Sequence, residues 1–385
     1  MSPPEPLGAE LRSRWMLRPG VAFLNHGSYG AVPRAVFEAQ SAWRVRLEAE
    51  PVEILGRRWP ELVAAAKRPV GELLGMAPGD FGLVTNATEG VNAVLRSLEF
   101  GPGDELLTTS HVYNAVRMAM RCTADRTGAA YVELAVPTPI ESAGRIVEAI
   151  AGAITGRTRL VVVDHVSSPT AVVFPVREIA AVCAARGVDL LVDGAHAPGM
   201  VDLDVPATGA TYYAGNLHKW CCAPRGSGFL WVRGDRHGRV HPCAVSHNYG
   251  KSLAEEFEWH GTRDASAWLT IPAALAFMGE LGWSRARAHN QALAVWARAA
   301  LCERWGVGPI APDEMLGSMA TVRLPGALAG MSEAAGLGYQ SALYHLHGVE
   351  APLVCWQGAW HVRVSAQVYN GVEDYERLMR AIDQL

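Results

Sequence analysis

Short apolar runs alternate along the chain with longer stretches whose apolar residues recur at helical spacing. The runs predict strands at 81–85, 102–109, 158–166, 188–196 and 228–233. Stretches with helical spacing follow or precede them at 89–98, 145–154 and 176–187. Because the apolar runs are continuous, we expect strands buried on both faces, as in a parallel sheet. The order of elements therefore predicts an α/β fold with a mostly parallel sheet between helices.

The pattern changes after about residue 265. Long helices are predicted at 266–283 and 285–305, short strands at 319–325 and 361–369, and a final helix at 372–385. This succession is typical of a smaller α+β domain. We expect a large domain at residues 20–265 and a small domain formed by residues 1–19 and 266–385.

Composition narrows the class of protein. The 385 residues are 50% apolar and carry a formal net charge of -4, and no basic run indicates a nucleic-acid partner. The seven cysteines have no spacing typical of a disulfide framework. No apolar stretch at the start suits a signal peptide, and none is long enough to cross a membrane. We expect a cytoplasmic protein without a membrane partner.

Asp193 and Lys219 indicate a particular chemistry. Asp193 ends the apolar run "DLLV", and a carboxylate there needs a cationic or donor partner, which a protonated pyridine nitrogen supplies. Lys219 stands between a histidine and a tryptophan in "AGNLHKW", and burial beside an aromatic residue lowers the pKa of a lysine. Together they predict a site for pyridoxal 5'-phosphate (PLP). A cap or salt bridge for Asp193 and a surface place for Lys219 are the alternatives.

Other candidates also follow apolar runs, where the ligands of open α/β sheets bind. "TNATEG" joins a strand to a helix, so backbone N–H groups near Thr88 are free to bind phosphate, although an ordinary helix cap looks the same. His111 and Tyr113 follow one strand, and 164–168 follows another. Arg363 lies in a short apolar strand and needs an anionic partner, either a substrate carboxylate or an interdomain salt bridge.

Motifs of several other enzyme classes are absent from the sequence. It contains no HExxH, paired CxxC, GxGxxG, GxxxxGK[ST] or GxSxG. His345 and His347 have no acidic or cysteine cluster beside them, so no metal site is expected.

These segments resemble a known family. "VDGAHAPGMVDLDV" followed by "YYAGNLHKWCCAPRGSGFLWV" is similar to the cofactor segment of the class V aminotransferases, PLP enzymes of fold type I. "LNHGSYGAVPRAVFE", "SSPTAVVFPV", "FEWHGTRDASAWL" and "RVSAQVYN" resemble the isopenicillin N epimerase-like branch of that family. The likeness extends from about residue 20 to the C-terminus.

The resemblance implies roles around the cofactor ring. Lys219 would bind PLP as a Schiff base and then move the Cα proton of the substrate, and Asp193 would pair with the pyridine nitrogen. His196 and Ser168 would lie near the ring hydroxyl, and His111 would stack on the ring.

It also implies roles at the phosphate and the substrate. The Ala87 and Thr88 amides, with the Asn216 and His218 side chains, would hold the phosphate. Thr262 would reach the phosphate of the neighbouring subunit, so a homodimer with shared active sites is expected. The substrate, a small amino acid, would be bound by a set of residues at the two ends of the chain: Asn25, His26, Gly27, Ser28 and Arg363.

The reaction that follows Cα activation stays open at this point. A C–S β-lyase acting on an S-conjugated cysteine in secondary metabolism is the first hypothesis. An epimerase is the second and needs an acid on the other face, for which Tyr113 or a histidine is a candidate. Decarboxylation with oxidative deamination is the third, and a PLP-binding regulatory module is the non-enzymatic alternative. Persulfide chemistry is disfavoured because Cys355 lies in the strand-like run "PLVCW".

Overall fold

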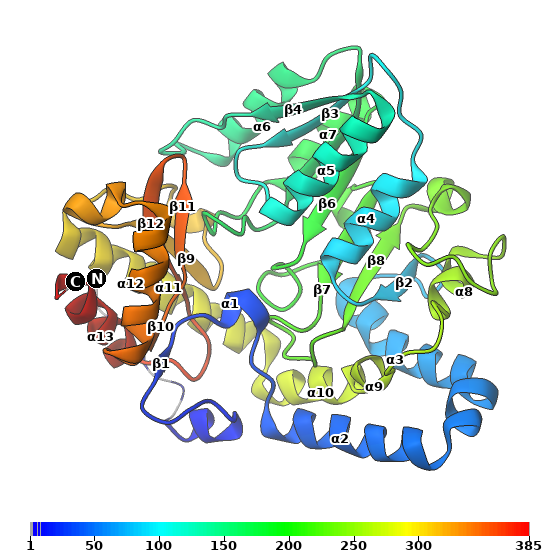
Figure 1. Ribbon diagram of the computed structural model, residues 1–385, viewed down its shortest axis with the longest axis horizontal. Coiled ribbons are helices and arrows are strands. Elements are labelled where there is room, and N and C mark those ends of the chain that lie inside the picture. Colours follow the sequence, from blue (N-terminus) through cyan, green and yellow to red (C-terminus); the bar gives the residue numbers. More distant parts are fainter. Residues whose placement is uncertain (1–2, 6, 8, 385) are drawn as a thin grey trace.

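The computed structural model describes residues 3–5, 7 and 9–384, and its largest element is a seven-stranded sheet (Figure 1). In the order in which they lie across this sheet, the strands are β2 (Phe81–Val84), β8 (Gly228–Val232), β7 (Tyr212–Asn216), β6 (Asp189–Gly194), β5 (Thr158–Asp164), β3 (Glu105–Thr109) and β4 (Ala130–Leu134). All neighbours from β7 to β4 are parallel, and β8 runs antiparallel to both β2 and β7. The predicted α/β fold with a mostly parallel sheet is confirmed.

Helices cover both faces of this sheet, as the continuous apolar runs require. Along β6, Leu190 and Val192 pack into one core and Leu191 packs into another on the opposite face. The face of Leu191 is covered by α4 (Ala87–Ser97) and α5 (Asn114–Thr127). The opposite face is covered by helices from several parts of the chain, namely α3 (Trp59–Leu74), α6 (Ala143–Ala153), α7 (Val176–Ala185) and α10 (Ile271–Leu281).

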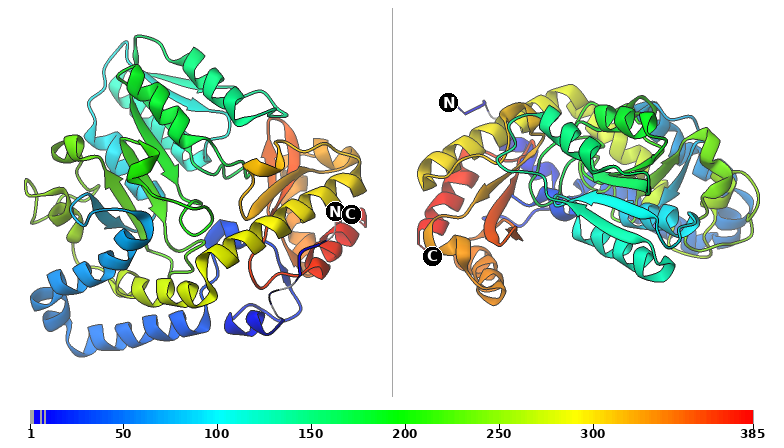
Figure 2. Two further views of the ribbon diagram at one scale, coloured as in Figure 1. Left: turned by 180° about the vertical axis from the view of Figure 1, so that it is seen from behind. Right: turned by 90° about the horizontal axis from the view of Figure 1, so that it is seen from above.

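A second, smaller group of elements packs around its own core. Its sheet has the order β11 (Leu353–Trp356), β12 (Ala359–Ser365), β9 (Met319–Arg323), and both pairs are antiparallel. Near the N-terminus, β1 (Ala22–Phe23) pairs in parallel with β10 (Val349–Glu350). The helices of this group are α11 (Trp283–Trp305), α12 (Glu333–His345) and α13 (Val372–Asp383). Figure 2 shows α11 running from the large sheet toward this group.

The remaining elements connect or border these two groups. They are η1 (Ala9–Arg14), α1 (His26–Tyr29), α2 (Arg34–Ala49), η2 (Glu53–Arg57), η3 (Pro206–Thr208), η4 (Gly234–Arg239), α8 (Leu253–Glu258), α9 (Ser266–Leu269), η5 (Asp313–Met315) and η6 (Gly326–Gly330). The short helix α1 lies between the large sheet and the small group (Figure 1).

One predicted helix is divided in the structure. The stretch 266–283 contains α9 and α10, which are separated at Thr270. Pro272 follows in the first turn of α10, where its missing N–H does no harm, and it favours a new helix start at this point. Both helices pack against α2 or α3 at the large sheet. The domain boundary at 265 stays a prediction.

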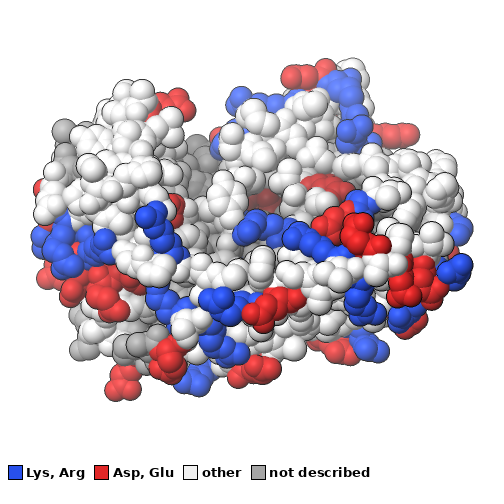
Figure 3. All heavy atoms as spheres, turned by 60° about the horizontal axis from the view of Figure 1, so that its bottom comes forward, with Lys and Arg blue, Asp and Glu red and all other residues white. Residues whose placement is uncertain are grey.

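No described helix has the length and apolar character needed to cross a bilayer. On the face shown in Figure 3, lysine and arginine side chains are interspersed with aspartate and glutamate. The cytoplasmic location stays a prediction.

Candidate active site

The ends of neighbouring strands bring most of the predicted residues to one edge of the large sheet. Asp193 pairs in register with Asp164 of β5 on one side and with Ala214 of β7 on the other. Asn216 is the last residue of β7, and Lys219 follows it in the loop toward β8. Because the carboxyl ends of parallel strands share one edge, a segment of 26 residues after Asp193 returns Lys219 to the same place.

Lys219 and His196 form the centre of this site. Lys219 Nζ lies 3.1 Å from His196 Nε2, and the Trp220 indole N–H donates to His196 Nδ1 at 3.4 Å. An indole nitrogen can only donate, so Nδ1 accepts, and in the neutral imidazole the hydrogen must be on Nε2. This N–H can donate to Lys219 only if the lysine amine is neutral.

The electrostatics of the site agree with a neutral amine. Burial, followed by the positive charge of Arg363, lowers the pKa of Lys219 to about 7. Burial and the neighbouring Lys219 also hold the pKa of His196 well below its usual value. The chain has three lysines. Lys67 donates to the Pro78 carbonyl and Lys251 is exposed near Glu255, so Lys219 is the one that meets this group of residues.

Two carboxyl groups are buried beside the lysine. Asp193 accepts from the Ala195 amide, and Asp164 accepts from the amides of Tyr113 and Ser168. Neither forms a salt bridge within the described part of the chain. Burial, followed by the negative charge of Asp193, raises the pKa of Asp164 well above its usual value. Burial raises the pKa of Asp193 as well, so this edge of the sheet would be stabilised by a positive charge.

The start of α4 is the predicted phosphate site. The Ala87 amide donates to Asn216 Oδ1 at 2.7 Å, so this backbone donor and this side-chain acceptor are already occupied by each other. Asn86 caps the helix by accepting from the Glu89 amide. The Thr88 amide and hydroxyl have no hydrogen bond within the described residues and are the donors left for an anion.

The hydrogen bonds of His218 and His111 limit the roles that were predicted for these two histidines. His218 Nδ1 lies 3.3 Å from the Ser227 carbonyl and must donate to it, so in the neutral ring Nε2 has no hydrogen to offer a phosphate. Burial lowers the pKa of His218 to about 4. To donate to a phosphate, the His218 imidazole must be protonated, a form that the negative charge of the phosphate would favour. His111 is buried between Phe174 and Trp356, with Nδ1 on Thr170 and Nε2 without a partner.

Arg363 of β12 forms the opposite wall. Its Nη1 donates to the Ser168 carbonyl and hydroxyl, and its Nη2 donates to Ser28 Oγ at 2.9 Å. Its Nε is buried without a partner, and no carboxylate of the described residues pairs with it. Burial lowers the pKa of Arg363 to about 10, and an anionic partner would compensate for the lost hydration of this charge. Ser168, predicted near the cofactor ring, lies here at the arginine.

The N-terminal segment joins this wall to the lysine loop. His26 donates from Nε2 to the Lys219 carbonyl at 3.0 Å and is bonded through Nδ1 to Tyr369. The Gly27 amide donates to Ser365 Oγ, and a Cβ at Gly27 would contact Met319 Sδ at 2.5 Å. The His26 ring and the Gly27 amide are therefore already bonded within the chain, and in this conformation neither is a free donor for a substrate.

The Gly30 backbone touches the lysine loop directly. Its φ is +68°, and a Cβ would overlap the His218 carbonyl oxygen. Only glycine permits both the backbone conformation and the close approach. The segment 26–30 therefore fixes the backbone of Lys219 as well as the Ser28 contact to Arg363.

Two phenols border the space between Lys219 and Arg363. Tyr113 is 42% exposed, and its pKa is raised by burial and by Asp193. Tyr29 is 71% exposed and lies near both Tyr113 and Arg363. Tyr29 and Trp220 were not predicted as functional residues, and no local sequence pattern distinguishes their roles.

Thr262 lies apart from the other predicted residues. It is exposed, in a loop held by His260, whose Nδ1 is 3.4 Å from Glu89 Oε1. Burial opposes the charge on Glu89, but bonds from His260 and Thr85 keep its pKa low, at about 2. A role for Thr262 in a neighbouring subunit stays a prediction.

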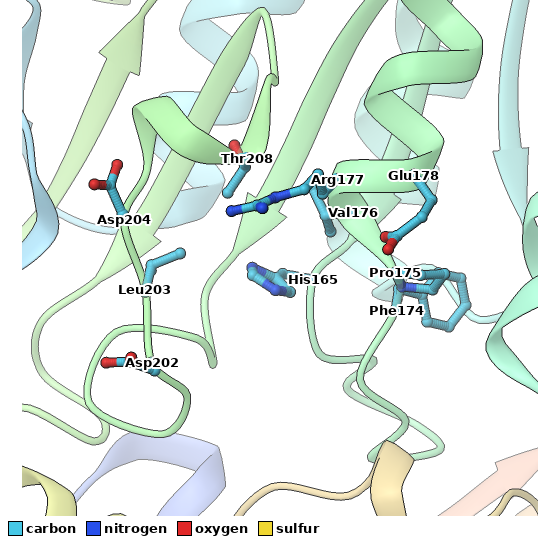
Figure 4. Close-up of a pocket in the computed structure, with 10 residues that line it drawn as sticks. All are labelled: His165, Phe174, Pro175, Val176, Arg177, Glu178, Asp202, Leu203, Asp204 and Thr208. Carbon is cyan, nitrogen blue, oxygen red and sulfur yellow. The ribbon is translucent and has the colours of Figure 1, made fainter.

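A separate hollow of about 410 Å³ lies near the start of α7 (Figure 4). Its lining includes His165 from the candidate range 164–168, Arg177 and Asp202, and it contains none of the residues to which the resemblance gives a role. His165 connects it to Tyr213 through a 2.7 Å hydrogen bond.

The chain has the groups that PLP requires. Asp193 is a buried acceptor without a cation, suited to a protonated ring nitrogen. Lys219 offers a neutral amine for the aldehyde, and Thr88 offers free donors at a helix start for the phosphate. These donors fit the cofactor that the sequence predicts.

Comparison with known proteins gives the family. The sequence profile named aminotransferase class-V matches residues 31–378. The chain is 34% identical to isopenicillin N epimerase of Streptomyces clavuligerus over 98% of each chain. It is 33% identical to L-cysteine desulfhydrase of Arabidopsis thaliana over 95% of this chain and 88% of the relative.

A solved structure supports the fold. A variant of C-DES with glycine covalently linked to its PLP cofactor superposes with a TM-score of 0.80 at 22% identity, covering 97% of this chain and 99% of that one. The fold type I arrangement is thereby confirmed.

Proposed function

Since the chain belongs to the aminotransferase class-V family of PLP-dependent enzymes, we propose that it is a C–S β-lyase acting on an S-conjugated cysteine. The observation that carries this proposal is the burial of Lys219 against His196, on the far side of the site from Arg363, an arginine without a carboxylate partner among the described residues. One group suits proton transfer at Cα, and the other suits the carboxylate of an amino acid.

When bound, PLP supplies an electron sink that stabilises negative charge at the substrate Cα. The chain's part in this is to keep the ring nitrogen protonated. Asp193 is buried at the sheet edge and accepts only the Ala195 amide, so it has a free oxygen for that proton. The Thr88 amide and hydroxyl would bind the phosphate at the start of α4.

Lys219 would then act as the base at Cα. Its amine is neutral above a pH of about 7, and the His196 N–H keeps its lone pair oriented. In β-elimination Lys219 takes the Cα proton, the Cβ–S bond breaks with its electron pair on sulfur, and the thiolate receives a proton from Lys219 or Tyr113. Water then completes the release of pyruvate and ammonia, so the sum is conjugate plus water giving thiol, pyruvate and ammonia.

Arg363 would orient the substrate for that step. Its carboxylate partner would take the unsatisfied Nε and could share Nη2 with Ser28. Holding the carboxylate at one wall and the amino group at Lys219 fixes two of the four substituents of Cα, which determines which bond faces the base.

Two observations support direct cleavage of the carbon–sulfur bond of a cysteine derivative. The relative from Arabidopsis thaliana is named L-cysteine desulfhydrase, which points to C–S cleavage on this scaffold. Cys355 lies within β11, next to Trp356, whose indole donates to the Ser110 carbonyl. A cysteine fixed in a strand does not suit a mobile sulfur carrier, so direct elimination is favoured over persulfide transfer.

Epimerisation is the second candidate. The relative from Streptomyces clavuligerus is an isopenicillin N epimerase, and an epimerase needs a second acid besides Lys219. Tyr113 and Tyr29 are phenols near Arg363 that could serve as this acid.

We also propose a homodimer in which Thr262 completes the partner's phosphate site.

The experiment that separates the candidates uses holoenzyme and a panel of cysteine S-conjugates in deuterated buffer. Pyruvate and ammonia in equal amounts with the thiol support the lyase. Deuterium at Cα and loss of optical purity without pyruvate support the epimerase. Carbon dioxide release indicates decarboxylation, and neither product nor exchange would leave only PLP binding.

A further inference from the structure

A second cavity borders the substrate wall. It has a volume of about 420 Å³ and is lined by Asn25 and Tyr29 from the segment that contacts Arg363. The rest of its lining comes from the segment that leads into β1, from β1 itself, from α12 and from β10, namely Met16, Leu17, Arg18, Val21, Phe23, Tyr344 and Glu350. The cavity therefore lies where the N-terminal segment meets the small group of elements.

Hydrogen bonds connect this cavity to the arginine. Arg363 Nη2 donates to Ser28 Oγ, Ser28 Oγ donates to Asn25 Oδ1, and Asn25 Nδ2 donates to Glu350 Oε1 at 2.9 Å. Tyr29, the residue after Ser28, lines the cavity together with Asn25. The cavity is thus adjacent to the wall that would bind the substrate carboxylate.

The lining has a definite chemistry. Leu17, Val21 and Phe23 give it apolar walls. Arg18 is bonded to the Tyr344 hydroxyl at 3.4 Å and forms no ion pair within the described residues. Glu350, in contrast, is held by Asn25. A ligand with an apolar body and an anionic end would match these walls and the unpaired Arg18.

We propose that this cavity binds the sulfur substituent of the substrate, and that the preferred substituent is an alkyl chain of several carbons ending in a carboxylate, bound by Arg18. This inference rests on the proposed function. Free L-cysteine has no group that could enter such a cavity, so the site indicates a conjugate larger than cysteine.

The test measures affinity and turnover separately with the holoenzyme. Binding of S-methyl-, S-propyl-, S-hexyl- and S-(5-carboxypentyl)-L-cysteine is followed through the change in the visible spectrum, and pyruvate is measured in parallel. Affinity should rise about fourfold for each methylene buried. The carboxypentyl conjugate should bind about two- to fivefold more tightly than the hexyl conjugate, because Arg18 is exposed and an ion pair there is partly screened by water.

Three variants locate the effect. Val21→Phe fills the cavity and should reduce the hexyl-to-methyl affinity ratio at least tenfold. Arg18→Met should abolish the preference for the carboxylate end and leave the hexyl-to-methyl ratio as it is. Val45→Phe, on the exposed surface of α2, is the control and should change neither ratio. Melting temperatures show whether each variant is folded.

The outcomes separate the two proposals. Affinity that does not rise with chain length in the unmodified enzyme, or a Val21→Phe variant that keeps the ratio, overturns the cavity assignment. If affinities follow the expected order but no conjugate yields pyruvate, the cavity assignment survives and the lyase proposal fails.

Discussion

The two walls of the candidate site are built in different ways. Asp193, Asn216 and Lys219 come from the ends of adjacent strands in one sheet, so backbone hydrogen bonds fix their spacing. In the wall around Arg363 and Ser28, residues 335 positions apart meet through a bond between their side chains, and the Ser365 amide adds one backbone bond to the Leu24 carbonyl. The first wall suits a cofactor that is always the same, and the second can change with the substrate without disturbing the sheet.

The walls are nevertheless coupled through charge and backbone. Arg363 lowers the pKa of Lys219, and His26 from the same segment as Ser28 bonds to the Lys219 carbonyl. A substitution in one wall should therefore change a measurable property of the other wall, such as the pKa of Lys219.

The largest effect is expected at Asp193. Asp193→Asn removes the charge that faces the ring nitrogen, and loss of one partner of a buried charge pair costs about 3–5 kcal/mol, or roughly a thousandfold in kcat. The spectrum of bound PLP should shift as well. Asp202→Asn, at an exposed carboxylate on Arg287, is the control. An Asp193→Asn enzyme with normal kcat would remove Asp193 from the mechanism.

Arg363→Met should act on the substrate wall. We expect kcat/KM to fall about a hundredfold, mainly through KM, because one charge-assisted carboxylate contact of about 2–3 kcal/mol is lost. Arg323→Met, at an exposed position of β9, should leave KM unchanged. A conjugate that lacks the α-carboxylate should have the same kcat/KM with the unmodified enzyme and with Arg363→Met. A hundredfold difference in kcat/KM between these two enzymes with that conjugate would contradict the assignment.

The coupling between the walls has a pH signature. In the cofactor-free enzyme, the rate of covalent PLP attachment should rise with pH through a midpoint near 7, because only the neutral Lys219 amine reacts. Removing the positive charge in Arg363→Met should move that midpoint to higher pH, since that charge opposes protonation of Lys219. An unchanged midpoint would show that the two walls are independent.

Trp220→Phe should give the smallest effect. It removes one hydrogen bond, the one that fixes His196 in the tautomer facing Lys219, and we expect about a tenfold loss in kcat. The charged and titratable groups that act on His196 are Lys219, Arg363, His218 and His26, so the pH profile should also shift. Trp231→Phe is the matched control, because that indole N–H has no partner within the described residues. Equal pH profiles for the two variants would show that Trp220 is only a packing residue.

The cofactor wall could be predicted from the sequence because its signals are local. Apolar runs such as 188–193 identify buried strands, and a polar residue at the end of each run then lies at the shared edge. The structure brings Lys219 to His196 near the sheet edge where Asp193 lies, although a role for His196 came only from the family resemblance, and the roles of these residues stay predictions.

The substrate wall could only partly be predicted. Arg363 was recognised as a charge in an apolar strand, but the Asn25 contact with Glu350 depends on β1 pairing with β10 across the whole chain. Which groups donate and which accept hydrogen bonds in this wall could not be predicted either, because the partners come from distant parts of the chain. Nothing in the sequence shows that the nitrogens of His26 are occupied by Lys219 and Tyr369.

Covalent trapping tests the central claim most directly. The chain contains lysine only at positions 67, 219 and 251, so borohydride reduction of the holoenzyme followed by peptide mapping gives an unambiguous answer. The account predicts the mass of reduced PLP on the peptide that contains Lys219, and its loss in Lys219→Ala. PLP on Lys67 or Lys251, or no covalent PLP in an enzyme that turns over, would contradict it.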